Sequence, residues 1–414
     1  MENQKGNSKV SVWCIVSMAS IPLVMTLGNS MLIPVLPVFE EKVNITSFQS
    51  SMIITSYSVA SIFLIPVAGY LSDRIGRKKV ILPSLILALI GGLIAGFASW
   101  KMDSPYTWII IGRILQGIGA SGASPIILPL VGDLYKDDDE KTSSTLGIIE
   151  TSNTFGKVLS PILGSLFAAV LWFLPFFSIS FFSLISIIFV FFCIKVPKNE
   201  DEPLKFKEFL KKTKATFKKE GKWLSVVFIL GVFVMLILFA VLFFLSDNLE
   251  KLHHLKGVKK GFILAIPLLF LCISSYIAGR KIKGSIPLMR KIILVSLILM
   301  SASVAFVGYT KDKLVIMLIL VSILGIAIGA LLPTLDALIT ENIEKEQRGT
   351  ISSFYSAARF IGVAAGPPLM SVLMKNHLNM SYIISAVIGL ILLFLVFKII
   401  NKKTLKPDDK KAES

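Results

Sequence analysis

Apolar runs long enough to cross a bilayer recur along the whole chain and leave little room for any other kind of fold. A helix needs about 20 apolar residues to span the hydrocarbon core, where it satisfies its own backbone hydrogen bonds. Twelve runs meet this requirement: residues 10–35, 50–71, 80–98, 106–134, 142–170, 173–196, 223–245, 258–279, 292–309, 314–339, 349–374 and 380–400. The sequence therefore predicts an all-α integral membrane protein with twelve transmembrane helices.

Composition excludes the main soluble classes. Asp, Glu, Lys and Arg make up 17% of the 414 residues, against roughly 25% in a soluble domain. Cys14, Cys193 and Cys272 all lie inside apolar runs without a CxxC spacing, so we expect no metal and no other cofactor. A net charge of +17 would suggest a nucleic acid partner for a soluble protein. Here the loop topology explains the charge, and no nucleic acid partner is expected.

The distribution of positive charge sets the expected orientation. Most of the 43 Lys and Arg residues lie on the side of the membrane that holds both termini. The positive-inside rule therefore places both termini in the cytoplasm. We expect a multi-pass protein of the plasma membrane, and the compact loops favour a bacterial host.

The longest polar stretch, residues 197–222, separates two sets of six runs. Within it, Phe206, Phe209, Leu210 and Phe217 recur at helical spacing among lysines, which predicts a basic amphipathic helix on anionic lipid. A solvated charged linker is the alternative. The expected organisation is an N-terminal six-helix bundle (1–196), this cytoplasmic linker (197–222), a C-terminal six-helix bundle (223–400) and a cytoplasmic tail (401–414).

Weak internal repeats relate the two halves. Gly117 and Pro125 in the fourth run recur as Gly325 and Pro333 in the tenth. Repeats of this size are a signal of the whole fold rather than of one element. A chain of two such halves resembles the architecture of the major facilitator superfamily, which implies two pseudo-symmetric six-helix bundles around a central cavity and a binding site near the middle of the membrane.

The stretch GYLSDRIGRKK at residues 69–79 lies between the second and third runs. Its glycines permit a tight turn, and its cations hold the loop at the inner surface. It resembles the signature loop of the major facilitator superfamily. The resemblance implies a gating loop whose acid helps to lock one of two rocking states. The implied gating residues are Gly69, Asp73, Arg74, Gly76 and Arg77.

Two further stretches refine this resemblance. GKVLSPILGS at residues 156–165 is similar to the antiporter motif of the superfamily, with Ser160 and Ser165 where Gly is usual. It implies a helix-packing motif of Gly156, Pro161, Gly164, Gly366 and Pro367. GNSMLIPVLP at residues 28–37 is similar to the opening motif of the drug:proton antiporter branch, the twelve-span multidrug efflux type. Many relatives carry an acid in this run, and here Asn29 is the central polar residue.

Charged residues inside the runs are functional candidates because a charge in hydrocarbon is costly. Arg113 begins RILQGIGA, which resembles the motif linked to proton transfer in the superfamily. Glu150 lies about two turns inside the fifth run, with Lys157 on the same face at i+7. Two interpretations stay open. Glu150 carries the coupled proton, aided by Arg113 and Lys157, or Glu150 and Lys157 form a structural pair.

The expected substrate cavity gathers the polar residues of several runs. Three deep cations against one clear anion predict a cavity that accepts neutral or anionic amphiphiles, siderophore-like metabolites among them. Asp133, Asp247, Asp336 and Glu341 lie near run ends, where we expect interfacial solvation. The candidate cavity residues are Asn29, Arg113, Gln116, Glu150, Lys157, Tyr355 and Arg359.

The resemblance implies a secondary transporter, not an enzyme, that exports small amphipathic molecules in exchange for protons by alternating access. Its expected partners are that substrate, protons and membrane lipids, and we expect a monomer. A symporter, a uniporter or a lipid flippase of the same fold is the alternative. A membrane receptor or scaffold without transport is the alternative of another class, but it would not need buried charges.

Overall fold

The computed structural model describes residues 11–135, 139–194, 206–282, 285–343 and 345–400, and within these ranges every regular element is a helix. The elements are α1 (Val12–Ser30), η1 (Ile33–Val35), α2 (Leu36–Val43), α3 (Ser47–Ile75), α4 (Arg77–Lys101), α5 (Tyr106–Ala123), α6 (Ile127–Leu134), α7 (Asp139–Val170), α8 (Leu174–Cys193), α9 (Phe206–Lys251), α10 (Gly257–Ile282), α11 (Ile286–Val307), η2 (Gly308–Thr310), α12 (Leu314–Asn342), α13 (Lys345–Asn376) and α14 (Leu378–Ile399).

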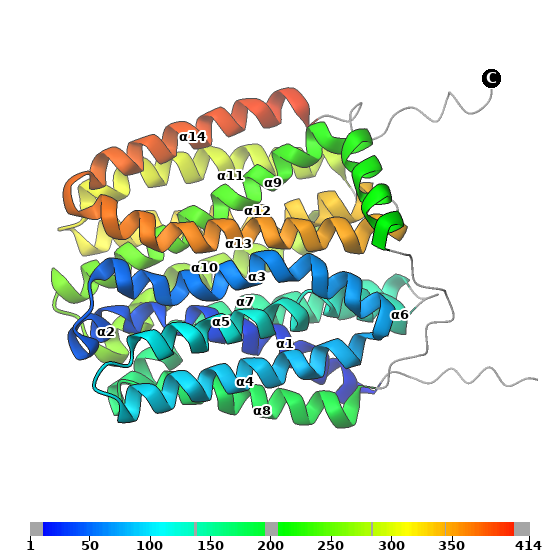
Figure 1. Cartoon of the computed structure of the whole chain (residues 1–414). Coiled ribbons are helices and arrows are strands. Elements are labelled where there is room, and N and C mark those ends of the chain that lie inside the picture. Colours follow the sequence, from blue (N-terminus) through cyan, green and yellow to red (C-terminus); the bar gives the residue numbers. More distant parts are fainter. Residues whose placement is uncertain (1–10, 136–138, 195–205, 283–284, 344, 401–414) are drawn as a thin grey trace, which may run out of the picture.

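The long helices lie side by side along one direction (Figure 1). Two of the predicted runs are broken helices. α1, η1 and α2 together form the first span, with Pro34 and Pro37 at the breaks. α5 and α6 form the fourth span, interrupted at Ser124 and Pro125. Proline breaks a helix because it lacks the backbone N–H and clashes with the preceding turn.

Helix packing repeats in the two halves of the chain. In the first half, α4 packs on α5 and α8, α3 on α5, and α1 on α7; in the second half, α11 packs on α12 and α14, α10 on α12, and α9 on α13. Each contact in one half has its counterpart in the other. The halves meet along two equivalent seams, α3 with α13 and α10 with α7. The predicted fold class is confirmed as two pseudo-symmetric six-helix bundles around a central cavity.

The repeated glycines lie at matching close approaches. A Cβ on Gly117 of α5 would collide with the backbone carbonyl of Tyr57 on α3, and a Cβ on Gly325 of α12 would collide with that of Pro267 on α10. A small residue lets two helix backbones come together without a side chain between them. The repeat in the sequence therefore marks the same helix crossing in each bundle.

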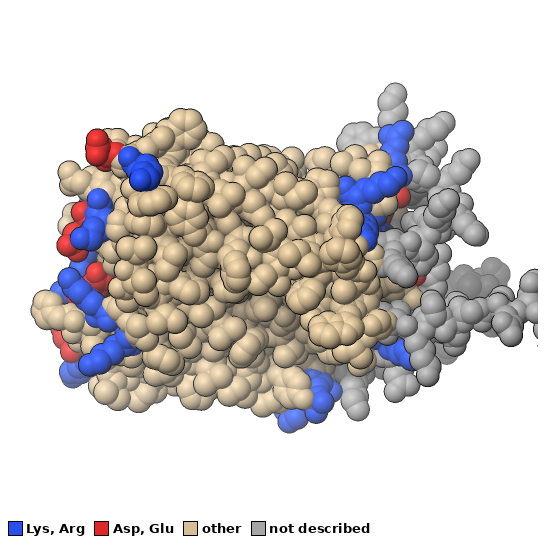
Figure 2. Space-filling model, turned by 90° about the horizontal axis from the view of Figure 1, so that it is seen from below, with Lys and Arg blue, Asp and Glu red and all other residues tan. Residues whose placement is uncertain are grey.

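Eleven of the described spans are long and apolar enough to cross a membrane, counting α1 to α2 and α5 to α6 as one each. The remaining predicted span is α7, which packs against α1 and α10 and carries Glu150, Asn153 and Lys157. Figure 2 shows charged residues toward the two ends of the molecule and a belt without charged residues between them on the face in view. The polar residues of α7 lower the mean hydropathy of this helix. They are tolerated in a membrane span because they face the interior of the protein rather than lipid.

Helix α9 runs without interruption from Phe206 to Lys251, so the residues predicted as a linker helix continue into the seventh span. Its first turns lie across the end of the bundle before the helix enters it (Figure 1). Phe217 packs edge-on against Phe228 and Phe354, with ring centroids 5.7 and 6.1 Å apart. The side chains of residues 206–210 lie outside the described residues, as do the tails 1–10 and 401–414. The amphipathic pattern and the division into four segments stay predictions.

Candidate transport cavity

A cavity of about 340 Å³ lies between the two bundles. Its walls come from α1, α3, α5, α6 and α7 of the first bundle and α9, α12 and α13 of the second. A second hollow of about 450 Å³ is lined by Gly69, Asp73 and Arg77. The two hollows share wall residues, Leu128 and Ser352 among them. The cavity therefore continues toward the end of the molecule where α3 turns into α4, which we call the Asp73 end.

The first bundle supplies a polar row along α7. Asn153 directs its side-chain amide toward both carboxylate oxygens of Glu150 at 3.4 Å and accepts a hydrogen bond from Thr26 of α1. Lys157 lies one turn further on and is 8% exposed. No ion pair joins Glu150 and Lys157, two residues that the structure describes. The predicted cavity positions of Asn29, Glu150 and Lys157 all lie on this cavity wall.

The second bundle supplies an ion pair. Arg359 of α13 lies 3.4 Å from both carboxylate oxygens of Asp336 on α12, and its guanidinium is 5.7 Å from the ring centroid of Tyr355. All three residues line the cavity. Arg359 and Tyr355 were predicted there from the sequence, whereas Asp336 was expected only near the end of a run, with interfacial solvation, and the structure adds it to the cavity wall. α12 continues to Asn342, so Asp336 lies well inside the helix.

The internal repeat matches Asp336 with an apolar residue of the first half, so it gave no signal for Asp336 in the sequence. The offset that relates Pro125 to Pro333 relates Leu128 to Asp336, and both of these residues line the cavity. The count of three cations against one anion therefore does not describe this cavity. Its wall carries Glu150 and Asp336 with Lys157 and Arg359, so the charges balance.

Arg113 and Gln116 do not line the cavity. Arg113 is fully buried behind it; its Nε donates to the carbonyl of Ile53 at 2.8 Å, and its Nη1 donates to the carbonyl of Gly28 at 2.7 Å and to Oε1 of Gln116 at 2.6 Å. The guanidinium lies 4.6 Å from the ring centroid of Tyr57, which itself lines the cavity. The arrangement ties α5 to α1 and α3. The parts predicted for Arg113 and Gln116 in substrate contact and coupling stay predictions.

The gating loop is ordered by pairs within the first bundle. Arg77 forms an ion pair with Asp73 and donates from Nε to Asp133 at 2.9 Å and from Nη1 to Ser72 at 2.7 Å. Gly76 separates α3 from α4 with a φ of +102°, a conformation that other residues rarely adopt. Arg74 is exposed. Gly69 faces Ser353 of α13, where the loop approaches the second bundle.

The helix-packing motif lies on α7 and α13, at contacts within each bundle and at the seam between α7 and α10. Gly156 faces Thr26 of α1, Gly164 meets the backbone of Met31, and the carbonyl of Pro161 abuts Gly261 of α10. In the second half, Gly366 approaches the backbone of α9 at Leu236, and Pro367 is buried. Small residues therefore set the distance between α7 and both of its neighbours.

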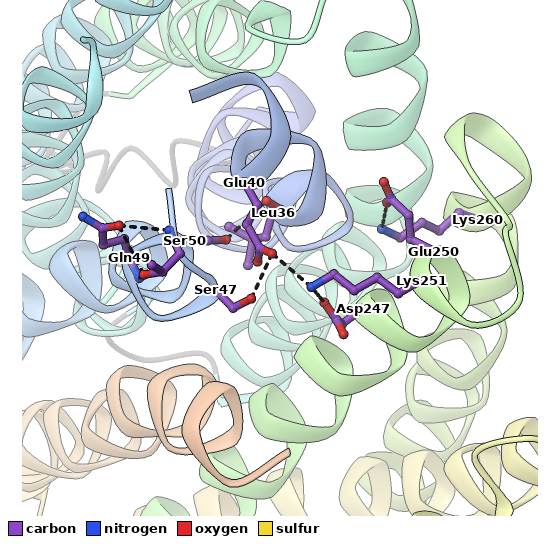
Figure 3. Close-up of polar contacts among 10 residues, drawn as sticks. Leu36, Glu40, Ser47, Gln49, Ser50, Asp247, Glu250, Lys251 and Lys260 are labelled. Carbon is purple, nitrogen blue, oxygen red and sulfur yellow. Dashed lines mark hydrogen bonds and ion pairs between the residues drawn. The ribbon is translucent and has the colours of Figure 1, made fainter. Parts of the chain in front are cut away.

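At the opposite end, which we call the Glu40 end, charged side chains join the two bundles (Figure 3). Lys251 of α9 lies 3.0 Å from Glu40 of α2 and 2.6 Å from Asp247 of its own helix. Ser47 of α3 also donates to Glu40 at 2.9 Å. The sequence predicted solvation for Asp247. In the structure Asp247 forms an ion pair with Lys251, the lysine that also contacts Glu40 of the other bundle.

A second, more buried contact lies beside the first (Figure 3). Lys260 of α10 is 1% exposed and donates to Glu250 of α9 at 2.7 Å and to the carbonyl of Pro34 at 2.7 Å. Ser246 of α9 donates to the carbonyl of Ile33 at 3.0 Å. The contacts with the carbonyls of Pro34 and Ile33 cross from the second bundle to the break in the first span. The structure is therefore a form closed at the Glu40 end and open toward the Asp73 end.

Comparison with known proteins gives this architecture a family. The family model described as Major Facilitator Superfamily matches residues 18–289 and 288–414. The chain belongs to the major facilitator superfamily. Within the superfamily, it is 52% identical over 389 residues to the bacillibactin exporter of Bacillus subtilis strain 168, covering 94% of this chain and 96% of that one. It is 22% identical over 373 residues to multidrug resistance protein 2 of the same organism, covering 88% and 90%.

Solved structures of superfamily transporters share the fold. The human organic anion transporter MFSD10 matches with a TM-score of 0.73 at 17% identity, over 93% of this chain and 99% of that one. A D-xylose–proton symporter matches with a TM-score of 0.76 at 15% identity, over 96% and 100%. The chain is a multi-pass membrane transporter of the major facilitator superfamily, and not an enzyme.

Proposed function

We propose that this transporter exports bacillibactin, or a siderophore of closely similar chemistry, in exchange for protons. The observation that carries the proposal is the 52% identity to the Bacillus subtilis exporter, which extends over nearly the full length of both chains. A cavity between two bundles, closed at one end and open toward the other, is the arrangement that alternating access requires.

The proposed setting is the plasma membrane of a bacterium, with both termini in the cytoplasm. The excess of Lys and Arg on the side of the termini supports this orientation. The Asp73 end then faces the cytoplasm, where an exporter takes up its substrate. A single chain encloses the whole cavity, which supports a monomer, surrounded by lipid along the apolar belt.

The proposed coupling acid is Glu150. An ionised carboxylate only accepts hydrogen bonds, so Glu150 binds substrate hydroxyl groups when it is deprotonated and loses acceptor sites when it binds a proton. Substrate and proton then occupy the site in turn, which is the requirement for antiport. The amide of Asn153 lies beside the carboxylate at 3.4 Å. The second pair, Asp336 and Arg359, faces Glu150 across the same cavity.

Transport into inverted membrane vesicles tests the proposal. Uptake of bacillibactin is measured under an imposed gradient with the acidic side inside, beside one neutral and one cationic amphiphile. We expect gradient-driven uptake that a protonophore abolishes, and a loss of about tenfold or more in Glu150→Gln. Glu41→Gln is the matched control because Glu41 is exposed at the surface of α2. Absence of bacillibactin uptake would overturn the substrate, and uptake that is indifferent to the gradient would overturn the coupling.

A further inference from the structure

Three buried polar atoms on the cavity wall have no hydrogen-bond partner within the described part of the chain. They are Nζ of Lys157, Oδ1 of Asn29 and the phenolic oxygen of Tyr355. Their residues are 8%, 8% and 2% exposed. Buried polar groups are almost always paired, and an unpaired ammonium is the costliest exception. A cluster of such atoms around one cavity indicates groups that pair with a ligand.

Helix packing fixes the level at which Lys157 enters the cavity. Gly156 faces Thr26 and Gly164 faces Met31, so α7 and α1 run side by side with Lys157 beside the turn that carries Asn29. Lys157 also lines a small apolar pocket that lies on the side of the pairs between Lys260 and the break in the first span. The Lys157 ammonium therefore lies at the end of the cavity that is nearer the closed Glu40 end of the molecule, where water is scarce. We call this the inner end of the cavity.

The other charges of the cavity leave Lys157 available. Asp336 is paired with Arg359, and Glu150 is hydrogen-bonded to Asn153 two turns before Lys157. Seven residues of helix separate Glu150 from Lys157, a rise of about 10 Å. The charges balance over the cavity as a whole, while the Lys157 ammonium has no direct partner among the residues that the structure describes.

We propose that Lys157 binds an oxyanion of the substrate, the phenolate or carboxylate of an amphipathic acid, at the inner end of the cavity. The inference rests on the export function proposed above and adds the chemical class that the cavity selects. An ammonium donates strong, charge-assisted hydrogen bonds to an oxyanion, and its flexible stem lets it reach a bound ligand. Asn29 accepts a hydrogen bond from a neighbouring hydroxyl of the same substrate. The substrate hydroxyl groups that donate to Glu150 lie nearer the Asp73 end, where the cavity is open.

Equilibrium binding to the purified full-length protein in lipid nanodiscs tests this directly. The probes are 2-naphthoate, 2-naphthylmethanol and 2-naphthylmethylamine, which share one ring system and differ in charge. We expect the wild type to bind 2-naphthoate about tenfold more tightly than 2-naphthylmethanol, the size typical of a charge-assisted hydrogen bond. Binding of 2-naphthylmethylamine should be the weakest of the three.

Variants of the lysine separate charge from packing. Lys157→Met and Lys157→Gln should bind the acid and the alcohol equally, whereas Lys157→Arg should keep the preference for the acid. Lys259→Met is the matched control, because Lys259 is exposed on α10 and should leave the preference unchanged. Unchanged binding of 2-naphthylmethanol shows that each variant is folded.

Two results would overturn the inference. One is a wild type that prefers the amine or treats the three probes alike, which needs no variant to be seen. The other is a preference for the acid that survives in both Lys157→Met and Lys157→Gln. Because binding is measured without transport, its outcome is independent of the vesicle experiment. Either result would remove the contact proposed for Lys157 and leave the export function proposed above in place.

Discussion

Lys251 of α9 reaches across the bundle interface to Glu40 of α2, with 3.0 Å between Nζ and Oε2. The lysine side chain is 50% exposed, so solvent screens the pair, and its contribution is at most about 1 kcal/mol. A contact of that size biases an equilibrium between two forms without fixing it. A transporter has to break and remake this contact in every cycle.

Removing this contact should shift the transporter toward a form open at the Glu40 end. We expect Lys251→Met to raise the alkylation rate of a cysteine placed at Ser246 by about two- to fivefold, as loss of about 0.5 to 1 kcal/mol predicts. The measurement uses an impermeant maleimide and a protein in which the three native cysteines are replaced. Lys259→Met serves as the control, and an equal rate in both variants would show that the pair does not hold this end closed.

The deeper pair of Lys260 and Glu250 should behave differently, since both side chains are buried. Lys260→Met leaves the Glu250 carboxylate without its cation and should destabilise the protein by about 3 to 5 kcal/mol. The double change with Glu250→Gln should recover most of that loss because neither charge then remains. Thermal unfolding of the purified protein measures the effect. Additive losses in the double variant would argue against a direct interaction.

Cavity-wall charges in the second bundle offer a test by exchange. Asp336→Asn should lower transport by about tenfold or more, because Arg359 then loses the carboxylate at 3.4 Å. Exchange of the two residues, Asp336→Arg with Arg359→Asp, should restore part of the activity if the pair itself matters. Vesicle uptake of bacillibactin is the readout. No recovery in the exchanged protein, when it is folded, would assign the two residues separate roles.

The matched helix crossings predict matched losses of stability. Gly117→Ala and Gly325→Ala each force a methyl group into a facing backbone carbonyl, and each should cost about 1 to 3 kcal/mol. Gly279→Ala is the control, since nothing lies within 4 Å of the added methyl group. The melting temperatures of the three variants, compared with that of the wild type, measure these losses of stability. A fall for only one of the two crossings would show that the bundles are not packed alike.

Much of the fold could be read from the sequence because bilayer thickness and backbone hydrogen bonding restrict the choices. The recurrence of Gly117 as Gly325 even located the same crossing in each bundle. The depth of a side chain within a span was harder to predict from the sequence. Asp336 was placed at an interface because the edge of an apolar run does not show how far a helix continues. The direction in which a side chain points was harder still to predict. Arg113 lies in the membrane as predicted, but only packing shows that it faces backbone carbonyls of α1 and α3 rather than the cavity.

The equivalence of the two seams has a consequence for the form that this structure does not show. α3 with α13 and α10 with α7 are related by the internal repeat, so each bundle offers its partner nearly the same surface. If the two bundles rocked against each other along these seams, the opening would move from the Asp73 end to the Glu40 end, and the helices of each bundle would keep their neighbours within that bundle. One chain thus offers an access route at each end of the cavity and uses the same two seams for both. The reversal requires small rotations along the two similar seams, which break the contacts at the Glu40 end and bring the bundles together at the Asp73 end.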